Sequence, residues 1–340
     1  MSLDVSYILP VLNEADYLEK AVQSVLDQDH DGATELIIAL APSTDGTNAI
    51  LERLMALHPQ IRIVDNPKRD IPIGLNLAIA ETRHPVVIRV DAHSEIPLDY
   101  TRKGVAALER VGAANVGGVM DATGDTAFQQ AVAHAYTSKV GMGNVSYHVG
   151  TEEGPAESAY LGVFRREVLV EVGGFDETIR RGEDWELNQR IIAAGHIVWF
   201  SPELRVKYWP RDSWGNLARQ FFATGVWRGE LLRRLGTSNS LRYFAPPLLV
   251  LGLVAGVVGA IVLSTGAGST FLRAVCALAL LPGLTYLALI VTVAASASLS
   301  LRARLWYLAV LPTMHIAWGS GFLWGAVRGA HKTIDTSRAD

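Results

Sequence analysis

The stretch that decides the fold is Val86-Val87-Ile88-Arg89-Val90-Asp91-Ala92-His93. Four of its first five residues are β-branched aliphatics, which is typical of a buried strand in a parallel sheet. Asp91 and His93 follow two residues apart where that strand ends. Strand carboxyl ends line the crevice in which open α/β sheets bind ligands. This pair could therefore hold a divalent cation, although many such pairs only begin a loop.

Strand and helix patterns alternate on both sides of this stretch. The other predicted strands cover residues 5–11, 35–40, 61–64, 116–120, 161–164 and 197–200. The predicted helices cover residues 15–28, 47–58, 73–80, 100–111, 128–139, 166–172 and 183–194. Such alternation predicts βαβ units with right-handed crossovers, and so an α/β fold with a mostly parallel sheet.

Three long apolar segments without Asp, Glu, Lys or Arg follow, at residues 244–263, 274–295 and 305–327. About 20 apolar residues are needed to cross the hydrocarbon core of a bilayer. A buried core helix is the alternative for one such segment, but three in succession argue against it. We expect two to three transmembrane helices over residues 243–328 and a polar tail over residues 329–340, with the third segment crossing or lying partly in the interface.

Charge is distributed unevenly along the chain. Residues 1–204 carry 16 Lys and Arg against 30 Asp and Glu, a balance of −14, whereas residues 205–242 carry 8 against 2, a balance of +6. A basic run can be a solvated helix face, but beside a spanning segment an anionic membrane surface is the expected partner. The predicted organisation is a domain over 1–204 and a basic, aromatic juxtamembrane collar over 205–242.

Arginines before the apolar segments predict the orientation in the membrane. Arg233, Arg234 and Arg242 precede the first segment, and Arg302 and Arg304 precede the third. The positive-inside rule then predicts a multi-pass cell-membrane protein whose amino-terminal domain is cytoplasmic. The single cysteine excludes a disulfide framework. The chain leads straight into a strand pattern, so we expect no signal peptide.

Four short motifs occur in one order. They are Pro10-Val11-Leu12-Asn13-Glu14, Ser43-Thr44-Asp45-Gly46-Thr47, Asp91-Ala92-His93 and Glu183-Asp184-Trp185. On these motifs the chain resembles the family 2 inverting glycosyltransferases of the GT-A fold, over roughly residues 4–230. Within that family it is most similar to bacterial exopolysaccharide transferases of the succinoglycan-assembly type. The resemblance implies a GT-A, Rossmann-like domain followed by carboxyl-terminal transmembrane helices.

The resemblance also implies a nucleotide-sugar donor held at the first two motifs. Asp45 would accept a hydrogen bond from the base. Pro10, Asn13 and Glu14 would shape the same pocket, although Asn13 and Glu14 could also serve as a helix cap. Arg69, together with Lys68, could reach the diphosphate or be a surface charge.

The third motif implies a divalent cation, Mn or Mg, at the leaving diphosphate. Asp91 would be one ligand and His93 a second. His93 departs from the acidic residue common at this position in the family, which favours Mn over strict Mg. The cation would neutralise charge that develops in the transition state.

The fourth motif implies the catalytic base. Asp184 matches the family's base, with Glu183 beside it, and a helix amino terminus should keep a carboxylate ionised. General-base action contributes roughly 10²–10⁴-fold in rate. The alternative is an acidic helix cap.

Residues 220–228 occupy the place of the Gln-x-x-Arg-Trp motif of processive relatives, but here Trp227 precedes Arg228 and the spacing is longer. This departure argues against a processive synthase. Arg228 could bind the diphosphate and Trp227 could line the acceptor site. A membrane-surface amphipathic helix is an equally good interpretation.

The predicted function is sugar transfer from a nucleotide sugar to a polyprenyl-linked saccharide, in the assembly of cell-surface polysaccharide or glycolipid. The alternatives are transfer to polyprenyl phosphate and a non-catalytic, nucleotide-sugar-binding membrane scaffold. Asp91 and Asp184 together argue against the scaffold, because binding alone does not require a base. Membrane lipid is an expected partner and nucleic acid is not.

Overall fold

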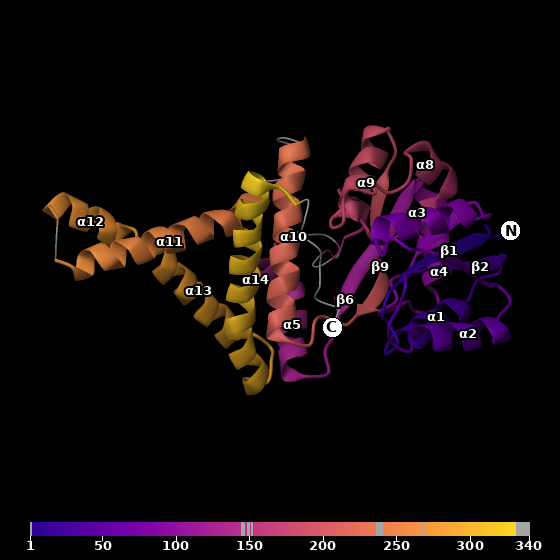
Figure 1. The fold of residues 1–340 in the computed structure, drawn as a ribbon, viewed down its shortest axis with the longest axis horizontal. Helices are drawn as coiled ribbons and strands as arrows, with labels where there is room; N and C mark the ends of the chain where they lie inside the picture. Colours follow the sequence, from indigo (N-terminus) through magenta and orange to yellow (C-terminus); the bar gives the residue numbers. More distant parts are fainter. Residues whose placement is uncertain are drawn as a thin grey trace. The chain divides into compact units, whose positions relative to one another are not determined.

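The structure of the protein is a computed structural model that describes residues 2–143, 147, 150, 152–235, 241–266 and 268–330 (Figure 1). It divides into two compact units. Unit 1 comprises residues 1–123 and 137–209, and unit 2 comprises residues 124–136 and 210–340.

Unit 1 is built on a nine-stranded sheet with helices along the chain between its strands. Its strands are β1 (Val5–Val11), β2 (Thr34–Leu40), β3 (Ile61–Asp65), β4 (Val86–Arg89), β5 (Ser94–Glu95), β6 (Asn115–Ala122), β7 (Gly154–Pro155), β8 (Tyr160–Arg165) and β9 (Val198–Tyr208). Its helices are α1 (Leu18–Leu26), α2 (Thr47–Leu57), α3 (Ile71–Glu81), α4 (Tyr100–Val111), α6 (Lys139–Met142), α8 (Arg166–Glu171) and α9 (Glu183–Ala193). The strand order is β3-β2-β1-β4-β8-β6-β9-β5, with β7 paired to β9.

Pairing within the sheet is mixed and confirms the expected α/β class. β1 pairs in parallel with both β2 and β4, and β2 pairs in parallel with β3. β8 runs antiparallel to its neighbours β4 and β6. All four residues of β4 are buried, as its apolar sequence predicted. β4 therefore lies in the middle of the sheet, and its carboxyl end opens where the parallel half meets the antiparallel strand.

β9 is longer than predicted from the sequence. It continues past residue 200 to Tyr208, with a register shift opposite Gly118. A Cβ atom at Gly118 would lie 1.7 Å from the carbonyl oxygen of Leu204, so glycine permits this close approach. Leu204, Val206 and Tyr208 are buried in alternation with exposed residues, which is a period-two strand signal. The start of the predicted collar is therefore part of the sheet.

Unit 2 is helical and includes a segment from the middle of the chain. Its elements are α5 (Ala127–Tyr136), α10 (Trp214–Leu235), a 3₁₀ turn (Leu241–Phe244), α11 (Ala245–Ser264), α12 (Thr270–Leu278), α13 (Leu281–Ser296) and α14 (Leu301–Arg328). The helix predicted over residues 128–139, which includes most of α5, was expected to belong to the amino-terminal domain over residues 1–204. In the structure its Phe128 ring packs edge-on against Trp306 of α14, with 5.2 Å between centroids. This aromatic contact joins α5 to the helical unit.

Helices α10 and α14 pack with their backbones in contact. Gly225 and Gly229 of α10 are four residues apart, as are Gly321 and Gly325 of α14. A Cβ atom at Gly225 would lie 2.1 Å from the carbonyl oxygen of Trp318, and one at Gly325 would lie 2.0 Å from that of Val226. Small residues spaced in this way let two helices approach closely.

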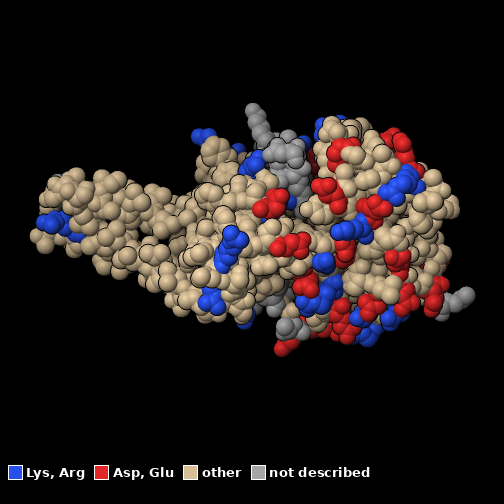
Figure 2. Space-filling view, turned by 90° about the horizontal axis from the view of Figure 1, so that it is seen from below, with Lys and Arg blue, Asp and Glu red and all other residues tan. Residues whose placement is uncertain are grey.

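Two helices in the described part of the chain are long and apolar enough to cross a membrane, by length and composition. They cover Ala245–Ser264 and Thr270–Ser296, and the second includes both α12 and α13. Large apolar side chains along them are exposed, including Leu251, Val257 and Leu287. In Figure 2 their surface is almost entirely tan, whereas unit 1 is dotted with acidic and basic side chains. Of the polar tail predicted over residues 329–340, residues 331–340 lie outside the described residues.

Candidate functional site

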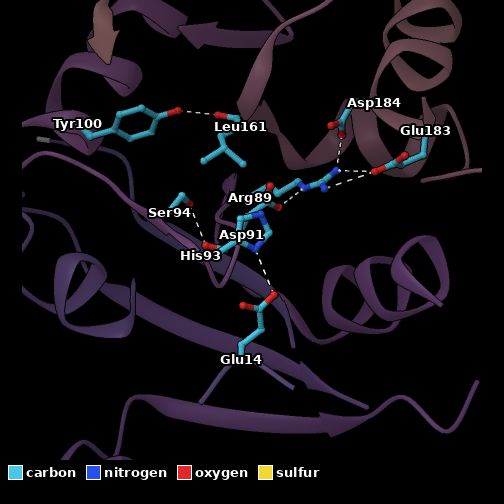
Figure 3. Close-up of polar contacts among 9 residues, drawn as sticks. All are labelled: Glu14, Arg89, Asp91, His93, Ser94, Tyr100, Leu161, Glu183 and Asp184. Atoms are coloured by element: carbon cyan, nitrogen blue, oxygen red, sulfur yellow. Dashed lines mark hydrogen bonds and ion pairs between the residues drawn. The ribbon is translucent and has the colours of Figure 1, made fainter. Parts of the chain in front are cut away.

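A buried arginine lies between the third and fourth motifs. Arg89, the last residue of β4, donates from Nε to Asp91 Oδ1 at 3.1 Å and from Nη1 to Glu183 Oε1 at 3.3 Å. It also donates from Nη1 to Asp184 Oδ1. Figure 3 shows the guanidinium between these carboxylates. The structure thus brings Asp91, Glu183 and Asp184 together around Arg89, which was not among the predicted site residues.

The backbone around Asp184 is held by glycine and asparagine residues. Gly182 precedes α9 with a φ of 77°, a left-handed conformation that favours glycine. One turn later, Asn188 donates from Nδ2 to the carbonyl oxygen of Asp184 at 2.8 Å. Asn188 in turn accepts a hydrogen bond at 2.7 Å from Nδ2 of Asn115 on β6. This buried chain ties the first turn of α9 to the sheet.

The environment of Asp184 suits a proton acceptor. Removal from water raises its pKa to about 7, against the attraction of Arg89 and with added repulsion from Glu183 and Asp91. A base is most effective when its pKa lies near the working pH. The side chain of Asp184 is 31% exposed while that of Arg89 is 6% exposed. A reacting hydroxyl could therefore reach the carboxylate but not the guanidinium behind it.

His93, in the third motif, contacts Glu14 of the first motif. Its Nδ1 lies 3.1 Å from Glu14 Oε1 (Figure 3). Its ring packs edge-on against Tyr208 at 5.9 Å between centroids. The adjoining strand β5 pairs with β9, which holds this turn against the sheet. Glu14, predicted to shape the nucleotide pocket, is thus also a partner of the predicted metal ligand.

A divalent cation would have two protein ligands here at most. Across the residues that the structure describes, no group of three or more His, Cys, Asp or Glu side chains could hold a metal ion. Cations at phosphate-transfer sites are often bound by one or two carboxylates plus substrate phosphates. Histidine ligands also commonly pair their second ring nitrogen with a carboxylate, as His93 does with Glu14. Asp91 and His93 therefore fit a cation that is completed by the donor diphosphate.

The first two motifs lie side by side, because β1 and β2 are neighbours in the sheet. The backbone N–H of Asn13 donates to Ser43 Oγ at 3.1 Å, and that of Thr44 donates to Asn13 Oδ1 at 2.8 Å. Asn13 itself has a φ of 53°. Pro10 pairs with Ala39 in the same ladder. The loops after β1 and β2 are therefore joined by hydrogen bonds at the carboxyl ends of their strands.

Asp45 joins these loops through its carboxylate. Oδ2 accepts from the backbone N–H of Ala15 at 3.1 Å, and Oδ1 accepts from that of Thr47 at 3.0 Å. Burial works to raise the pKa of Asp45, but hydrogen bonds from Thr47 and Ala15 outweigh it and lower the pKa. The carboxylate is ionised and oriented, as an acceptor of a base N–H must be. The same bonds also make it a structural clasp of the loop.

Two other predicted diphosphate ligands, Arg69 and Arg228, lie outside the four motifs along the chain. Arg69 lies in an exposed turn after β3 with a φ of 57°. Arg228 belongs to α10 in unit 2, where its Cζ lies 3.8 Å from the ring centroid of Tyr243. Trp227 is buried in the same unit. Diphosphate binding by either arginine stays a prediction.

One sequence signal could have identified Arg89. It is the only charged residue in the otherwise apolar stretch 86–90. Charged residues are almost never fully buried unless paired. An arginine within a predicted central strand therefore implies carboxylates nearby, and the motifs offered them. The partners themselves could not be chosen from the sequence, because all four motifs carry an acidic residue.

The chain matches one family model and is similar in sequence to several known proteins. The sequence model described as Glycosyl transferase family 2 matches residues 6–173. The succinoglycan biosynthesis protein ExoA of Rhizobium meliloti (strain 1021) is 33% identical over 257 residues, covering 75% of this chain and 78% of that protein. A Methanococcus voltae protein is 24% identical over 249 residues, covering 71% of this chain and 77% of that protein. It is named dolichyl N-acetyl-alpha-D-glucosaminyl phosphate 3-beta-D-2,3-diacetamido-2,3-dideoxy-beta-D-glucuronosyltransferase.

One solved structure has a similar fold over nearly the whole chain. It is the mannosyltransferase PcManGT from Pyrobaculum calidifontis in complex with GDP-Man and Mn2+. The TM-score is 0.58 at 19% sequence identity, and the match covers 97% of this chain and 87% of that chain. At this identity the likeness concerns the fold.

Proposed function

The chain belongs to glycosyltransferase family 2, and from this premise we propose that it is a membrane-bound inverting transferase. It moves one sugar from a nucleotide sugar to a polyprenyl-linked saccharide, in the assembly of an exopolysaccharide or glycolipid. The observation that carries this proposal is the approach of Asp184, at the start of α9, to Asp91, at the end of β4, through a shared arginine.

Asp184 is the proposed base. It takes the proton of the acceptor hydroxyl as that oxygen attacks the anomeric carbon, and the nucleoside diphosphate leaves from the opposite face. Such a single displacement inverts the configuration. The pKa of about 7 supports this role, because a large fraction of the carboxylate is then ionised at neutral pH while it remains basic.

The donor is proposed to lie over the loops after β1 and β2. Asp45 accepts from the base, and Pro10 and Asn13 form the floor of the same pocket. The locked geometry of these loops supports a rigid nucleotide site. GDP-Man in the structurally similar mannosyltransferase supports the nucleotide-sugar class and leaves the sugar of this protein to experiment.

A divalent cation, Mn or Mg, is proposed to bind Asp91 and His93. It would neutralise the charge that accumulates on the departing diphosphate. The chain's part is to hold the two ligands: Arg89 fixes Asp91, and Glu14 orients the ring of His93. Mn2+ in the structurally similar mannosyltransferase supports this proposal.

The acceptor is proposed to be lipid-linked. Two helices of unit 2 are apolar enough to cross a membrane, and the preceding segment 205–242 is basic. The Methanococcus voltae relative is named for action on a dolichyl-linked sugar phosphate. Transfer directly to polyprenyl phosphate is the alternative acceptor chemistry, since it would require the same membrane attachment.

The proposed location is the cell membrane, with unit 1 on the cytoplasmic side. Arg233 and Arg234 at the end of α10 precede the first span, which supports this orientation. α14 packs along α10, which carries several charged residues and is unsuited to the hydrocarbon core. We therefore propose two spans, with α10 and α14 together at the membrane surface.

The test is a donor screen on membranes containing the full chain. Nucleoside diphosphate release is measured for a panel of nucleotide sugars, with and without a polyprenyl-linked saccharide. The proposal expects release from one donor that depends on the lipid acceptor, and a product of inverted anomeric configuration by NMR. Binding of a nucleotide sugar without any release would instead indicate the scaffold.

A further inference from the structure

We propose that Arg89 is a positioning residue that holds Asp184 and Asp91 in one fixed geometry. The inference rests on the proposed function, in which one of these carboxylates is the base and the other binds the cation. In this arrangement a single guanidinium couples Asp91, which would bind the cation at the donor, to Asp184, which would act on the acceptor.

The three guanidinium nitrogens of Arg89 reach two places in unit 1, the end of β4 and the start of α9. Nε contacts Asp91 beyond β4, and Nη1 contacts both Glu183 and Asp184 at the start of α9. Nη2 also approaches Glu183 Oε1, at 3.4 Å. A guanidinium presents its donors in a rigid planar fork, so the directions of these contacts depend on one another. A displacement of α9 would therefore also change the position of the Asp91 carboxylate.

The guanidinium is buried between the sheet and the loop before α9. Arg89 pairs with Ile8 in the centre of the sheet and is 5% exposed. Its Cζ lies 5.8 Å from the ring centroid of Phe175. Phe175 is held by its backbone N–H, which donates to Asn76 Oδ1 at 2.8 Å. Both the strand and the loop before α9 thus fix the arginine.

The total charge of Arg89 and its three carboxylate partners can be kept while the geometry is changed. This distinguishes a positioning role of Arg89 from simple charge neutralisation. When its three carboxylates are ionised, one arginine leaves a net of two negative charges (3 − 1 = 2). Lysine at position 89 would keep that total but present one ammonium group instead of a fork. It could not hold Asp91 and Asp184 in the same directions at once.

The first experiment compares Arg89→Lys with Arg62→Lys in the full detergent-solubilised chain. Arg62 is a matched control on edge strand β3, where it pairs with Glu35 at 3.1 Å and Glu81 at 3.4 Å. Three quantities are measured: kcat with saturating donor, the Mn2+ dissociation constant by EPR, and the thermal midpoint. For Arg89→Lys we expect kcat to fall ~10–100-fold and the Mn2+ dissociation constant to rise ~10–100-fold. The control should match the parent in both.

A second variant removes the question of charge. Arg89→Gln with Glu183→Gln takes away one positive and one negative charge, so the cluster keeps its total. An arginine that only compensates charge would leave Mn2+ binding unchanged in this double variant. Positioning predicts the same weakening as in Arg89→Lys, measured against the parent, whose cluster has the same total charge.

The outcomes distinguish this inference from the proposed function. If the parent protein transfers sugar and Arg89→Lys matches Arg62→Lys in kcat or in Mn2+ binding, the positioning role is overturned. If the parent transfers no sugar from any donor, the proposed function fails, and Mn2+ binding still decides whether Arg89 positions Asp91.

Discussion

His93 Nδ1 lies 3.1 Å from Glu14 Oε1. When that nitrogen donates its proton to the carboxylate, the lone pair of the imidazole resides on Nε2, the nitrogen that would bind a metal. We expect chelation to abolish transfer and Mn to restore it at least as well as Mg. Glu14→Gln should weaken Mn2+ binding ~10–100-fold by EPR. Glu19→Gln, an exposed partner of Arg53, is the control. Full activity in excess chelator would contradict the metal site.

Replacing the proposed base should stop chemistry without displacing the donor. Asp184→Asn keeps the shape of the side chain but removes its proton affinity, so kcat should fall at least ~10²-fold with the donor KM nearly unchanged. Asp29→Asn removes an exposed acid that pairs with Arg102 and serves as the control. Turnover within a few-fold of the parent would transfer the role to another residue, with Glu183 the next to test.

The pH dependence of activity should report the ionisation of Asp184. Desolvation raises its pKa to about 7, and the base must be ionised to accept a proton. The rate constant kcat/KM should therefore rise with pH through about 7 and fall about tenfold per pH unit below it. When folding raises the pKa of a carboxyl group, the free energy of unfolding of the protein falls as the pH rises from the ordinary carboxyl pKa to the raised one. At about pH 8, Asp184→Asn should thus melt no lower than the parent. A flat profile between about pH 5 and 8 would argue against this base.

The end of α14 should lie on the same side of the membrane as unit 1. The chain is prepared with Cys276→Ser, which removes its single cysteine. Val327→Cys, at an exposed position near the end of α14, should then react with an impermeant maleimide only in inside-out vesicles. Thr265→Cys, in the turn after α11, should react only from the outside. Labelling of position 327 from outside would mean that α14 crosses the membrane.

The acceptor prediction can be tested with matched substrates. The detergent-solubilised protein is given a polyprenyl-linked saccharide or the same free saccharide at equal concentration. We expect transfer to the lipid-linked form to exceed transfer to the free sugar by at least ~10-fold, because binding energy from remote parts of a substrate also accelerates its reaction. Equal rates would reduce the apolar helices to an anchor.

Most strands and helices of unit 1 could be predicted because each has a recognisable pattern of apolar residues within its own sequence. The apolar stretch 86–90 is a central buried strand, and the predicted helix over residues 100–111 forms with the same bounds. The resemblance to family 2 glycosyltransferases is confirmed by a relative that is 33% identical. The antiparallel direction of β8 was not predicted, since a short apolar run has the same pattern in either direction.

The sequence by itself determined the alternation of strands and helices, the apolar helices, and the order of motifs that end at Asp184. These are carried by residues within one turn or one strand of each other. The tertiary structure alone decided that Arg89 joins Asp91 to Glu183, which is 94 residues away from it. It also decided that α5 packs with the helices after residue 209. Contacts of this kind depend on how crossovers return the chain to the sheet, and a local periodicity does not encode which distant side chain fills a buried position.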